Sequence, residues 1–230
     1  MIYTSALIVG AGAGLSASLA RLFAKQELKV SLAARSADKL SALTQETGAR
    51  AFTCDASERG QVDKLFADLD AAALTPDVVV YNASYRTRGP FIDLDAAEVA
   101  KSIEITAYGA FLVAQAAARR MQPKNHGAIL LTGASAGVKG YAQSAPFAMG
   151  KFALRGLSQS MARELHPQGI HVCHFVIDGG IKSDRRATPA DQPDSLLDPD
   201  AIATSYWQVL QQPRSAWSQE FELRPSVEKF

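Results

Sequence analysis

Short runs of apolar residues alternate with longer amphipathic stretches along most of the chain. The first run, residues 6–9, ends at Gly10, and the stretch after it carries Leu15, Leu19 and Phe23 on one helical face. This pattern predicts strands at 6–9, 30–34, 51–54, 78–81, 128–132, 171–177 and 220–223, and helices at 15–25, 37–46, 61–70, 96–121, 145–165 and 198–212. Such alternation indicates an α/β protein with a doubly wound, mainly parallel seven-stranded sheet and helices on both faces.

The predicted helix 145–165 contains a lysine one turn after a phenylalanine. Phe147 and Lys151 share one face, and an apolar ridge formed by Met149, Ala153, Leu157, Met161 and Leu165 lies roughly opposite. A lysine outside the apolar ridge is typical of a solvated side chain. From this helix alone, we expect Lys151 on the exposed side.

Composition and charge favour one domain, residues 1–230, with a small-molecule partner. The chain is 47% hydrophobic with a formal net charge of +1, and neither a long basic run nor a membrane-length apolar run occurs. We therefore expect no nucleic-acid partner and no membrane partner. The only cysteines, Cys54 and Cys173, adjoin apolar runs, which favours buried thiols in the cytoplasm over a disulfide framework. No metal site is expected.

Residues 181–197 lack periodicity and are rich in Arg, Asp, Pro and Ser. A long loop of this kind often covers a binding site, so we expect a substrate loop or lid here. Arg185 and Arg186 in this loop could bind an anionic substrate or be solvated, and the solvated interpretation is favoured.

A glycine cluster, Gly10-Ala-Gly-Ala-Gly14, joins the first strand to the helix that starts at Leu15. Without side chains at Gly10, Gly12 and Gly14 the backbone can approach a pyrophosphate, and the helix N-terminus supplies N–H donors. A tight turn alone would also explain the glycines, but their place after the first strand favours a Rossmann-type dinucleotide site.

The second predicted strand ends in Arg35 and Ser36, where many dinucleotide sites have an acid for the ribose 2′-hydroxyl. Arginine and serine can instead hold a 2′-phosphate by charge-assisted hydrogen bonds. The sequence therefore predicts NADP(H) in preference to NAD(H), with an ordinary surface arginine as the alternative.

Five spaced motifs together resemble the short-chain dehydrogenase/reductase family over nearly the whole chain. They are the glycine cluster, Cys54-Asp55-Ala56, Asn82-Ala83-Ser84, the helix that holds Lys151, and Asp178-Gly179-Gly180-Ile181. The resemblance implies that Asp55 and Ala56 flank the adenine, that Asn82 and Ala83 border the cofactor, and that Gly179, Ile181 and Ser183 meet the nicotinamide end. It also implies a homodimer or homotetramer formed through the helices 96–121 and 145–165.

Several positions depart from the family pattern. Val9, Ser16 and Ser84 replace a threonine and two glycines of the cofactor motifs. More consequentially, the Y-x-x-x-K motif, whose tyrosine transfers a proton and whose lysine holds the nicotinamide ribose, reads Phe147-Ala-Met-Gly-Lys151. The resemblance therefore assigns Lys151 to the cofactor ribose, in conflict with the solvated position that the helix pattern favours.

The other two proton-handling positions of the family are also altered. Ala134 aligns with the assisting serine, with Ser135 beside it, and Thr106 aligns with the asparagine that holds a relay water. Ser135 is the best replacement, although it would point to the opposite face if the strand still continued there. The remaining hydroxyl and imidazole groups considered, Tyr85, Tyr108, Tyr141, Ser144, His166, His171 and His174, are better explained by packing or structural roles.

Two functions from different classes are compatible with these residues. The first is an NADP(H)-dependent oxidoreductase acting on a carbonyl or alcohol, with the proton supplied by water, by the substrate or by a non-standard side chain. The second is a catalytically inactive NADP(H)-binding regulator or sensor, and a non-redox use of the fold also stays open. The oxidoreductase is favoured, because the nicotinamide-facing segment Ile181-Lys-Ser183 would be idle in a mere adenine-nucleotide binder.

Overall fold

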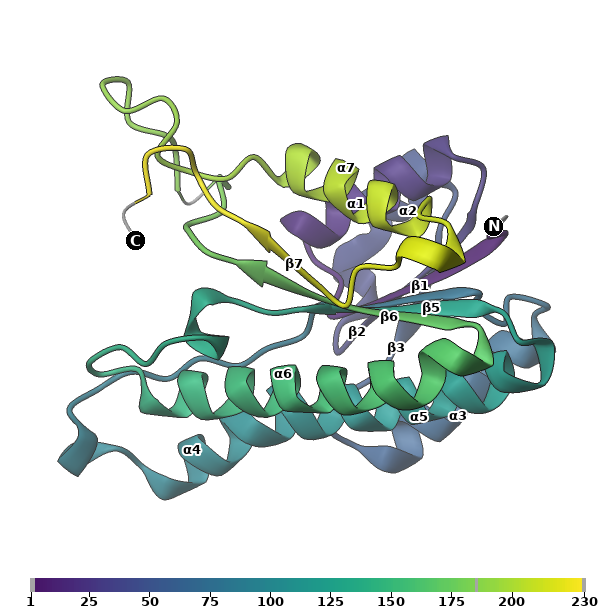
Figure 1. The fold of residues 1–230 in the computed structure, drawn as a ribbon, viewed down its shortest axis with the longest axis horizontal. Coiled ribbons are helices and arrows are strands. Elements are labelled where there is room, and N and C mark those ends of the chain that lie inside the picture. Colours follow the sequence, from purple (N-terminus) through teal and green to yellow (C-terminus); the bar gives the residue numbers. More distant parts are fainter. Residues whose placement is uncertain (1–2, 185, 229–230) are drawn as a thin grey trace.

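All seven strands of the computed structural model run parallel in one sheet (Figure 1). The structure describes residues 3–184 and 186–228. The strands are β1 Ser5–Val9, β2 Lys29–Ala34, β3 Arg50–Thr53, β4 Val78–Tyr81, β5 Gly127–Thr132, β6 Ile170–Ile177 and β7 Glu220–Leu223. Their spatial order, β3-β2-β1-β4-β5-β6-β7, confirms the predicted doubly wound α/β class.

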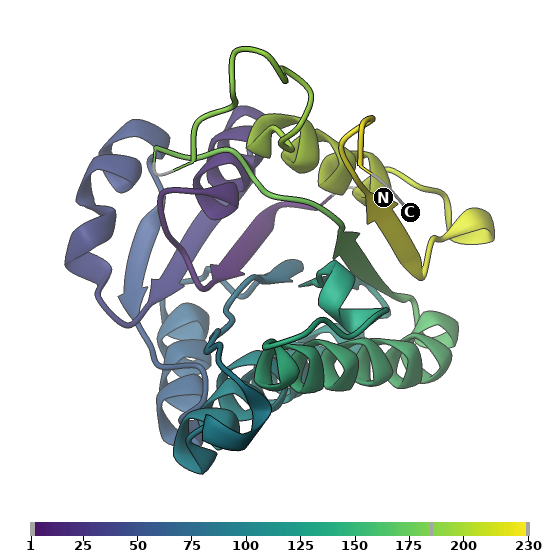
Figure 2. The same ribbon diagram turned by 90° about the vertical axis from the view of Figure 1, so that its left-hand side faces the viewer.

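Helices cover both faces of the sheet, as the view turned by 90° shows (Figure 2). One face carries α1 Leu15–Lys25, α2 Ser41–Thr47 and α7 Pro199–Leu210, and the other carries α3 Arg59–Ala71, α4 Ala96–Ile103, α5 Gly109–Met121 and α6 Ala145–Leu165. Shorter 3₁₀ turns are Ala37–Leu40, Phe91–Asp93, Gln122–Lys124, Ser135–Gly137, His166–Gln168 and Arg214–Ala216, and a π turn spans Glu104–Tyr108.

The strands are apolar on both faces because each face packs on helices. Along β5, Ala128 and Leu130 belong to the core under α1 and α7, whereas Ile129 and Leu131 belong to the core under α3, α5 and α6. The period of two along the strand therefore supplies both cores from one run of apolar residues.

The long helix predicted at 96–121 is interrupted. A π turn, Glu104–Tyr108, joins α4 to α5, and Thr106 lies fully buried within it. Gly150 of α6 packs against this turn: a side-chain carbon added there would lie 3.0 Å from Thr106 Cβ. Close packing at this turn, which a periodicity argument does not detect, therefore brings α6 against the bulge.

The apolar ridge predicted on α6 packs on the core only in its second half, at Leu157, Met161 and Leu165. Met149 is 49% exposed, whereas Lys151 is only 3% exposed and Leu154, Ser158 and Ala162 are buried at helical spacing. This face packs against α4, the π turn and β6, where small residues and a lysine stem fit. Lys151 thus belongs to the buried face of α6.

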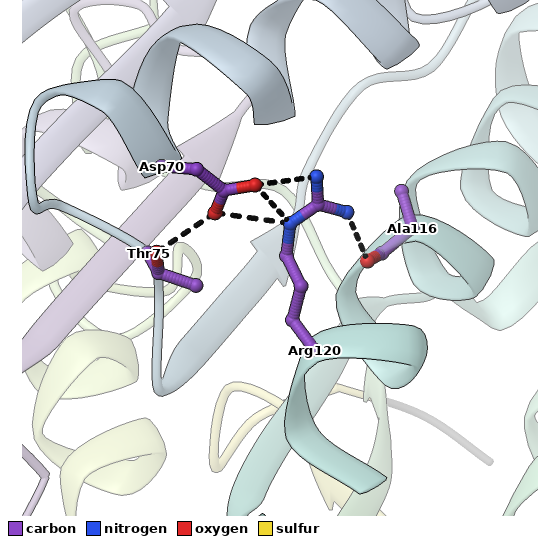
Figure 3. A network of polar contacts seen from close by, with 4 residues as sticks. All are labelled: Asp70, Thr75, Ala116 and Arg120. Atoms are coloured by element: carbon purple, nitrogen blue, oxygen red, sulfur yellow. Dashed lines mark hydrogen bonds and ion pairs between the residues drawn. The ribbon is translucent and has the colours of Figure 1, made fainter. Parts of the chain in front are cut away.

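An arginine of α5 joins this helix to α3 (Figure 3). The Arg120 guanidinium donates to the Asp70 carboxylate from Nε (2.8 Å) and lies 2.6 Å from it through Nη2, while Nη1 donates to the Ala116 carbonyl (3.0 Å). Asp70 also accepts from the Thr75 hydroxyl at 2.7 Å.

Both cysteines are buried and free. Within the described ranges, no helix combines the length and the apolarity needed to cross a membrane, and no cluster of three metal-ligating side chains occurs there.

Candidate active site

Two neighbouring cavities lie at the carboxyl ends of the strands. The smaller, about 540 Å³, borders the loops after β1, β2 and β3, and the larger, about 810 Å³, borders the loops after β5 and β6. Asn82 and Ser84, which follow β4, line both. The strand order reverses between β1 and β4, and such a switch point is where doubly wound sheets bind their ligands.

The glycine turn between β1 and α1 leaves room for a phosphate. Gly10 has φ +82°, and a side chain there would meet the Ala83 backbone nitrogen at 2.4 Å, so this position requires glycine. Gly12 and Gly14, by contrast, face open space. The α1 N-terminus has no side-chain cap, so its N–H groups and partial positive charge are available to an anion. These residues therefore fit a dinucleotide pyrophosphate.

Ser16, a departure from the family motif, points into the protein rather than into the cavity. It is 1% exposed, donates to the Gly10 carbonyl (3.1 Å) and accepts from Asn82 Nδ2 (2.7 Å). Its side chain links the glycine turn to the segment after β4 and leaves the pyrophosphate position clear.

Basic and hydroxyl groups gather at one wall of the smaller cavity. Arg35 and Ser36 line it as the sequence predicts, and Lys39 joins them from the following 3₁₀ turn. The acid in this cavity, Asp55, accepts hydrogen bonds from the Ser57 backbone (3.0 Å) and hydroxyl (2.6 Å). The sequence analysis did not predict Lys39, because the 3₁₀ turn, and not the strand pattern, brings it to the same cavity as Arg35.

Ala56 and Ala83 also line the smaller cavity, whereas Leu15, Gly179, Ile181 and Ser183 line the larger one. The structure thus divides the residues that the resemblance assigns to the adenine and nicotinamide ends between two adjoining cavities.

Lys151 lines the larger cavity from within the protein. Its ammonium donates to the Thr132 carbonyl at 2.7 Å and lies 5.6 Å from the centre of the Phe147 ring. Burial lowers the pKa of Lys151 to about 8. The solvated lysine expected from the helix pattern is therefore wrong, since the residues that bury it come from other elements.

Ser135 faces the same cavity as Lys151 and Phe147. Strand β5 ends at Thr132, and a 3₁₀ turn begins at Ser135, so the alternation that would turn Ser135 away from Ala134 no longer applies. Both residues line the cavity. Within residues 3–184 and 186–228 the Ser135 hydroxyl has no hydrogen-bond partner, which leaves it available to a ligand.

Thr106 lies outside the lining of both cavities. It is fully buried, and its hydroxyl accepts from the Tyr85 backbone at 3.3 Å. Among the described residues no hydrogen bond joins it to Ser135 or Lys151, so its predicted catalytic role has no support from the cavity walls. The π turn that holds it does shape the base of α6, as such turns often do near functional sites.

The other hydroxyl and imidazole groups hold mainly structural positions. Tyr141 lines the larger cavity but is 46% exposed, and the Tyr85 hydroxyl donates to Glu98. Burial lowers the pKa of both His171 and His174 to about 4. His171 stacks on Trp217 with ring centres 4.6 Å apart, and His174 bonds to Glu220.

The loop 181–197 projects beyond the carboxyl ends of the strands (Figure 1). Its two ends are held together, because Lys182 N–H donates to Leu197 O (2.9 Å) and Leu197 N–H donates to Gly180 O (2.8 Å). Arg186 lines the larger cavity, while Arg185 lies outside the described residues. Arg86 and Arg88, absent from the sequence-based site, line the cavity from the opposite segment.

The fold, the glycine turn and the paired cavities define a dinucleotide-binding α/β protein. A model of the short chain dehydrogenase family matches residues 4–193, and the chain belongs to this family of NAD(P)-dependent oxidoreductases. Phe147 and Ala134 lie within the matched region.

Relatives in this family carry different names. The chain is 32% identical to a cyclic-di-GMP-binding biofilm dispersal mediator protein of Escherichia coli K12, over 81% of this chain and 76% of that protein. It is 33% identical to a trans-4-hydroxycyclohexanecarboxylate dehydrogenase of Sinomonas cyclohexanicum, over 77% of this chain and 72% of that protein. A metagenomic short-chain oxidoreductase solved with NADP superposes with a TM-score of 0.84 and 26% identity, over 97% of this chain and 98% of that one.

Proposed function

We propose that this protein is an NADP(H)-dependent oxidoreductase that interconverts a carbonyl compound and its alcohol without a catalytic tyrosine. The observation that carries the proposal is that the buried Lys151 and the Ser135 hydroxyl line one cavity, which adjoins the basic wall of Arg35, Ser36 and Lys39. The bound cofactor would supply or accept the hydride at the carbonyl carbon.

The chain's own residues would manage position and charge. Arg35, Ser36 and Lys39 would bind the 2′-phosphate, and the uncapped α1 N-terminus would bind the pyrophosphate. Lys151 would hold the nicotinamide ribose, and its positive charge would stabilise negative charge on the substrate oxygen. In the reduction direction, Ser135 would donate a hydrogen bond to that oxygen and pass it a proton drawn from cavity water.

The second candidate function, an NADP(H)-binding regulator without catalysis, also has a specific observation in its support. Phenylalanine at 147 and alanine at 134 remove two hydroxyls at the family's reacting positions, and one relative is named as a binding protein and mediator. We rank it second because Ser135 and Lys151 still line one cavity.

The partner and location proposals rest on surface and cysteine chemistry. Tyr108 and Phe111 of the π turn and α5, and Met149 and Phe152 of α6, are 40–49% exposed, which supports a homodimer or homotetramer through these helices. Two free buried thiols suit a cytoplasmic protein. The single-domain assignment, residues 1–230, fits one continuous sheet.

The cofactor assignment predicts that NADPH binds at least tenfold more tightly than NADH, or about 1.4 kcal/mol. Fluorescence titration of wild type, Arg35→Ala and Lys39→Ala measures it, with the exposed Arg59→Ala on α3 as the matched control. Both cavity variants should lose most of the preference, and the control should keep it. Equal affinities in wild type, or a preference unchanged by Arg35→Ala, would refute the assignment.

A further inference from the structure

The larger cavity has a cationic wall. Arg86 and Arg88, after β4, line it from one segment, and Lys182 and Arg186, after β6, line it from another. Among the described residues, none of the three arginine side chains has a carboxylate within ion-pair distance. A family site for a neutral carbonyl compound does not require such a wall.

The acids in this cavity do not neutralise the arginines. Asp178 is 4% exposed and already faces Arg224 (3.2 Å) and Lys139 (3.9 Å). Glu228 is the other lining carboxylate, and it forms no ion pair with the arginines within the described chain. The wall therefore keeps a surplus of positive charge.

The guanidinium groups lie close enough to affect one another. Burial, together with the charges of Arg88 and Arg186, lowers the pKa of Arg86. Arg186 is exposed but passes close to Gly180, where an added side-chain carbon would lie 2.7 Å from its Nη1. Positive charges gathered in this way repel one another, and an anion bound between them would offset this repulsion. The cluster is therefore suited to a negatively charged ligand.

Phe147 connects the cationic wall to the reacting end of the cavity. The Arg86 guanidinium carbon lies over its ring at 4.9 Å, and the Lys151 ammonium lies over the same ring at 5.6 Å. The aromatic face holds Arg86 in place where a tyrosine hydroxyl is missing. An anion bound at Arg86 would therefore lie near the group that Lys151 and Ser135 address.

We propose that Arg86, Arg88 and Arg186 form an anion-binding site, and that the substrate is a carbonyl or hydroxy compound carrying an oxyanion such as a carboxylate close to its reacting carbon. This inference rests on the proposed oxidoreductase function. Guanidinium forks bind carboxylates by paired hydrogen bonds, which would fix the orientation of a small substrate.

The test compares an acid with its neutral ester. Calorimetry measures binding of benzoylformate and of methyl benzoylformate to the protein saturated with NADP⁺, and to the cofactor-free protein. The proteins are wild type, Arg88→Gln/Arg186→Gln, and a control of equal charge change, Arg59→Gln/Arg163→Gln, on exposed helix surface. Wild type and the control should bind the acid at least about tenfold more tightly than the ester, and the cavity variant should lose that preference.

Equal binding of acid and ester by wild type, or a preference that survives in the cavity variant, would overturn the proposal. So would an equal loss of NADPH affinity in that variant, because the arginines would then serve the cofactor phosphates. The melting temperature of each variant is measured to show that it folds. If the double variant misfolds, the single variant Arg88→Gln takes its place in the binding test. Turnover is measured separately: acid binding without reduction contradicts the oxidoreductase, and reduction without acid preference contradicts the anion site.

Discussion

Phe147 changes what its neighbours can do. In the family motif a tyrosine hydroxyl would stand beside the lysine, whereas here two cations, Arg86 and Lys151, lie over an aromatic face. The ring attracts both charges through its quadrupole but offers no proton. Under the proposed function, the proton would come from Ser135, water or the substrate, and the loss of a positioned acid would cost about 10²–10⁴-fold in rate.

Burial of Lys151 predicts a pH dependence of stability. Its folded-state pKa of about 8 lies below the usual value of about 10.4, so between these values the unfolded chain binds more protons. By linkage, the free energy of unfolding rises with pH across this window. Relative to Lys151→Met, cofactor-free wild type should gain about 1–3 kcal/mol between pH 7.5 and 10.5.

Urea unfolding of both proteins at several pH values measures this difference, since all other groups titrate alike in the pair. A difference that stays flat across the window would mean that Lys151 titrates as a solvated lysine and is not part of a buried site.

Whether the sequence could predict a site residue depended on whether its position follows from its own strand or helix or from contacts with other elements. Gly10, Arg35 and Asn82 all follow strand ends. The strand pattern placed Gly10 and Arg35 at the site, and the family resemblance added Asn82. Lys151 was misplaced by helical periodicity, because its contacts come from outside the helix, from the Thr132 carbonyl and from the 3₁₀ turn at Gly137. Arg86 was missed because its proximity to Arg186 arises only when two loops from different strands meet.

At the level of elements, the sheet order could be expected once strands and helices alternated, but local irregularities could not. The π turn depends on the close approach of Gly150 to Thr106, a contact between separate helices. The end of β5 at Thr132, which turns Ser135 into the cavity, likewise depends on the following 3₁₀ turn. If a strand ends one residue earlier or later, the side chain that follows can lie on the other face of the sheet.

The contact between α3 and α5 gives a prediction for stability. Hydrogen bonds from Arg120 and then Thr75 hold the pKa of Asp70 below its usual value, and the Arg120 guanidinium also lies 5.0 Å from the Phe66 ring centre. Arg120→Ala should lower the free energy of unfolding by about 1–2 kcal/mol at pH 7, as the pair is only partly exposed.

The effect should shrink in acid. A lowered carboxyl pKa contributes stability that is present above about pH 3.9 and is lost as the pH falls through the folded-state pKa. The control is Lys64→Ala, which removes an exposed pair with Asp68 on α3 and should cost less than about 0.5 kcal/mol. Equal effects of both variants in urea unfolding at pH 7 would contradict the bridging role of Arg120.

At the scale of the whole molecule, the fold brings residues that follow six strand ends together at one edge of the sheet. The glycine turn and Arg35 border the smaller cavity, and Ser135, Phe147 and the loop 181–197 border the larger one. Under the proposed function, this division would place the phosphate end and the reacting end of the cofactor in adjoining cavities. The proposed function therefore requires hydride transfer in a site that has Phe147 and Ala134 where the family pattern has a tyrosine and a serine.

Isotope transfer tests that claim most directly. Wild type and the folded variant Phe147→Tyr/Ala134→Ser are incubated with NADPH deuterated at nicotinamide C4 and a panel of diketones and oxo acids. Mass spectrometry then measures deuterium on the carbinol carbon of the product. We predict incorporation by wild type on at least one oxo acid, with little gain in the variant. No incorporation by NADPH-loaded wild type, with incorporation by the folded variant, would contradict the claim and identify the protein as a binder.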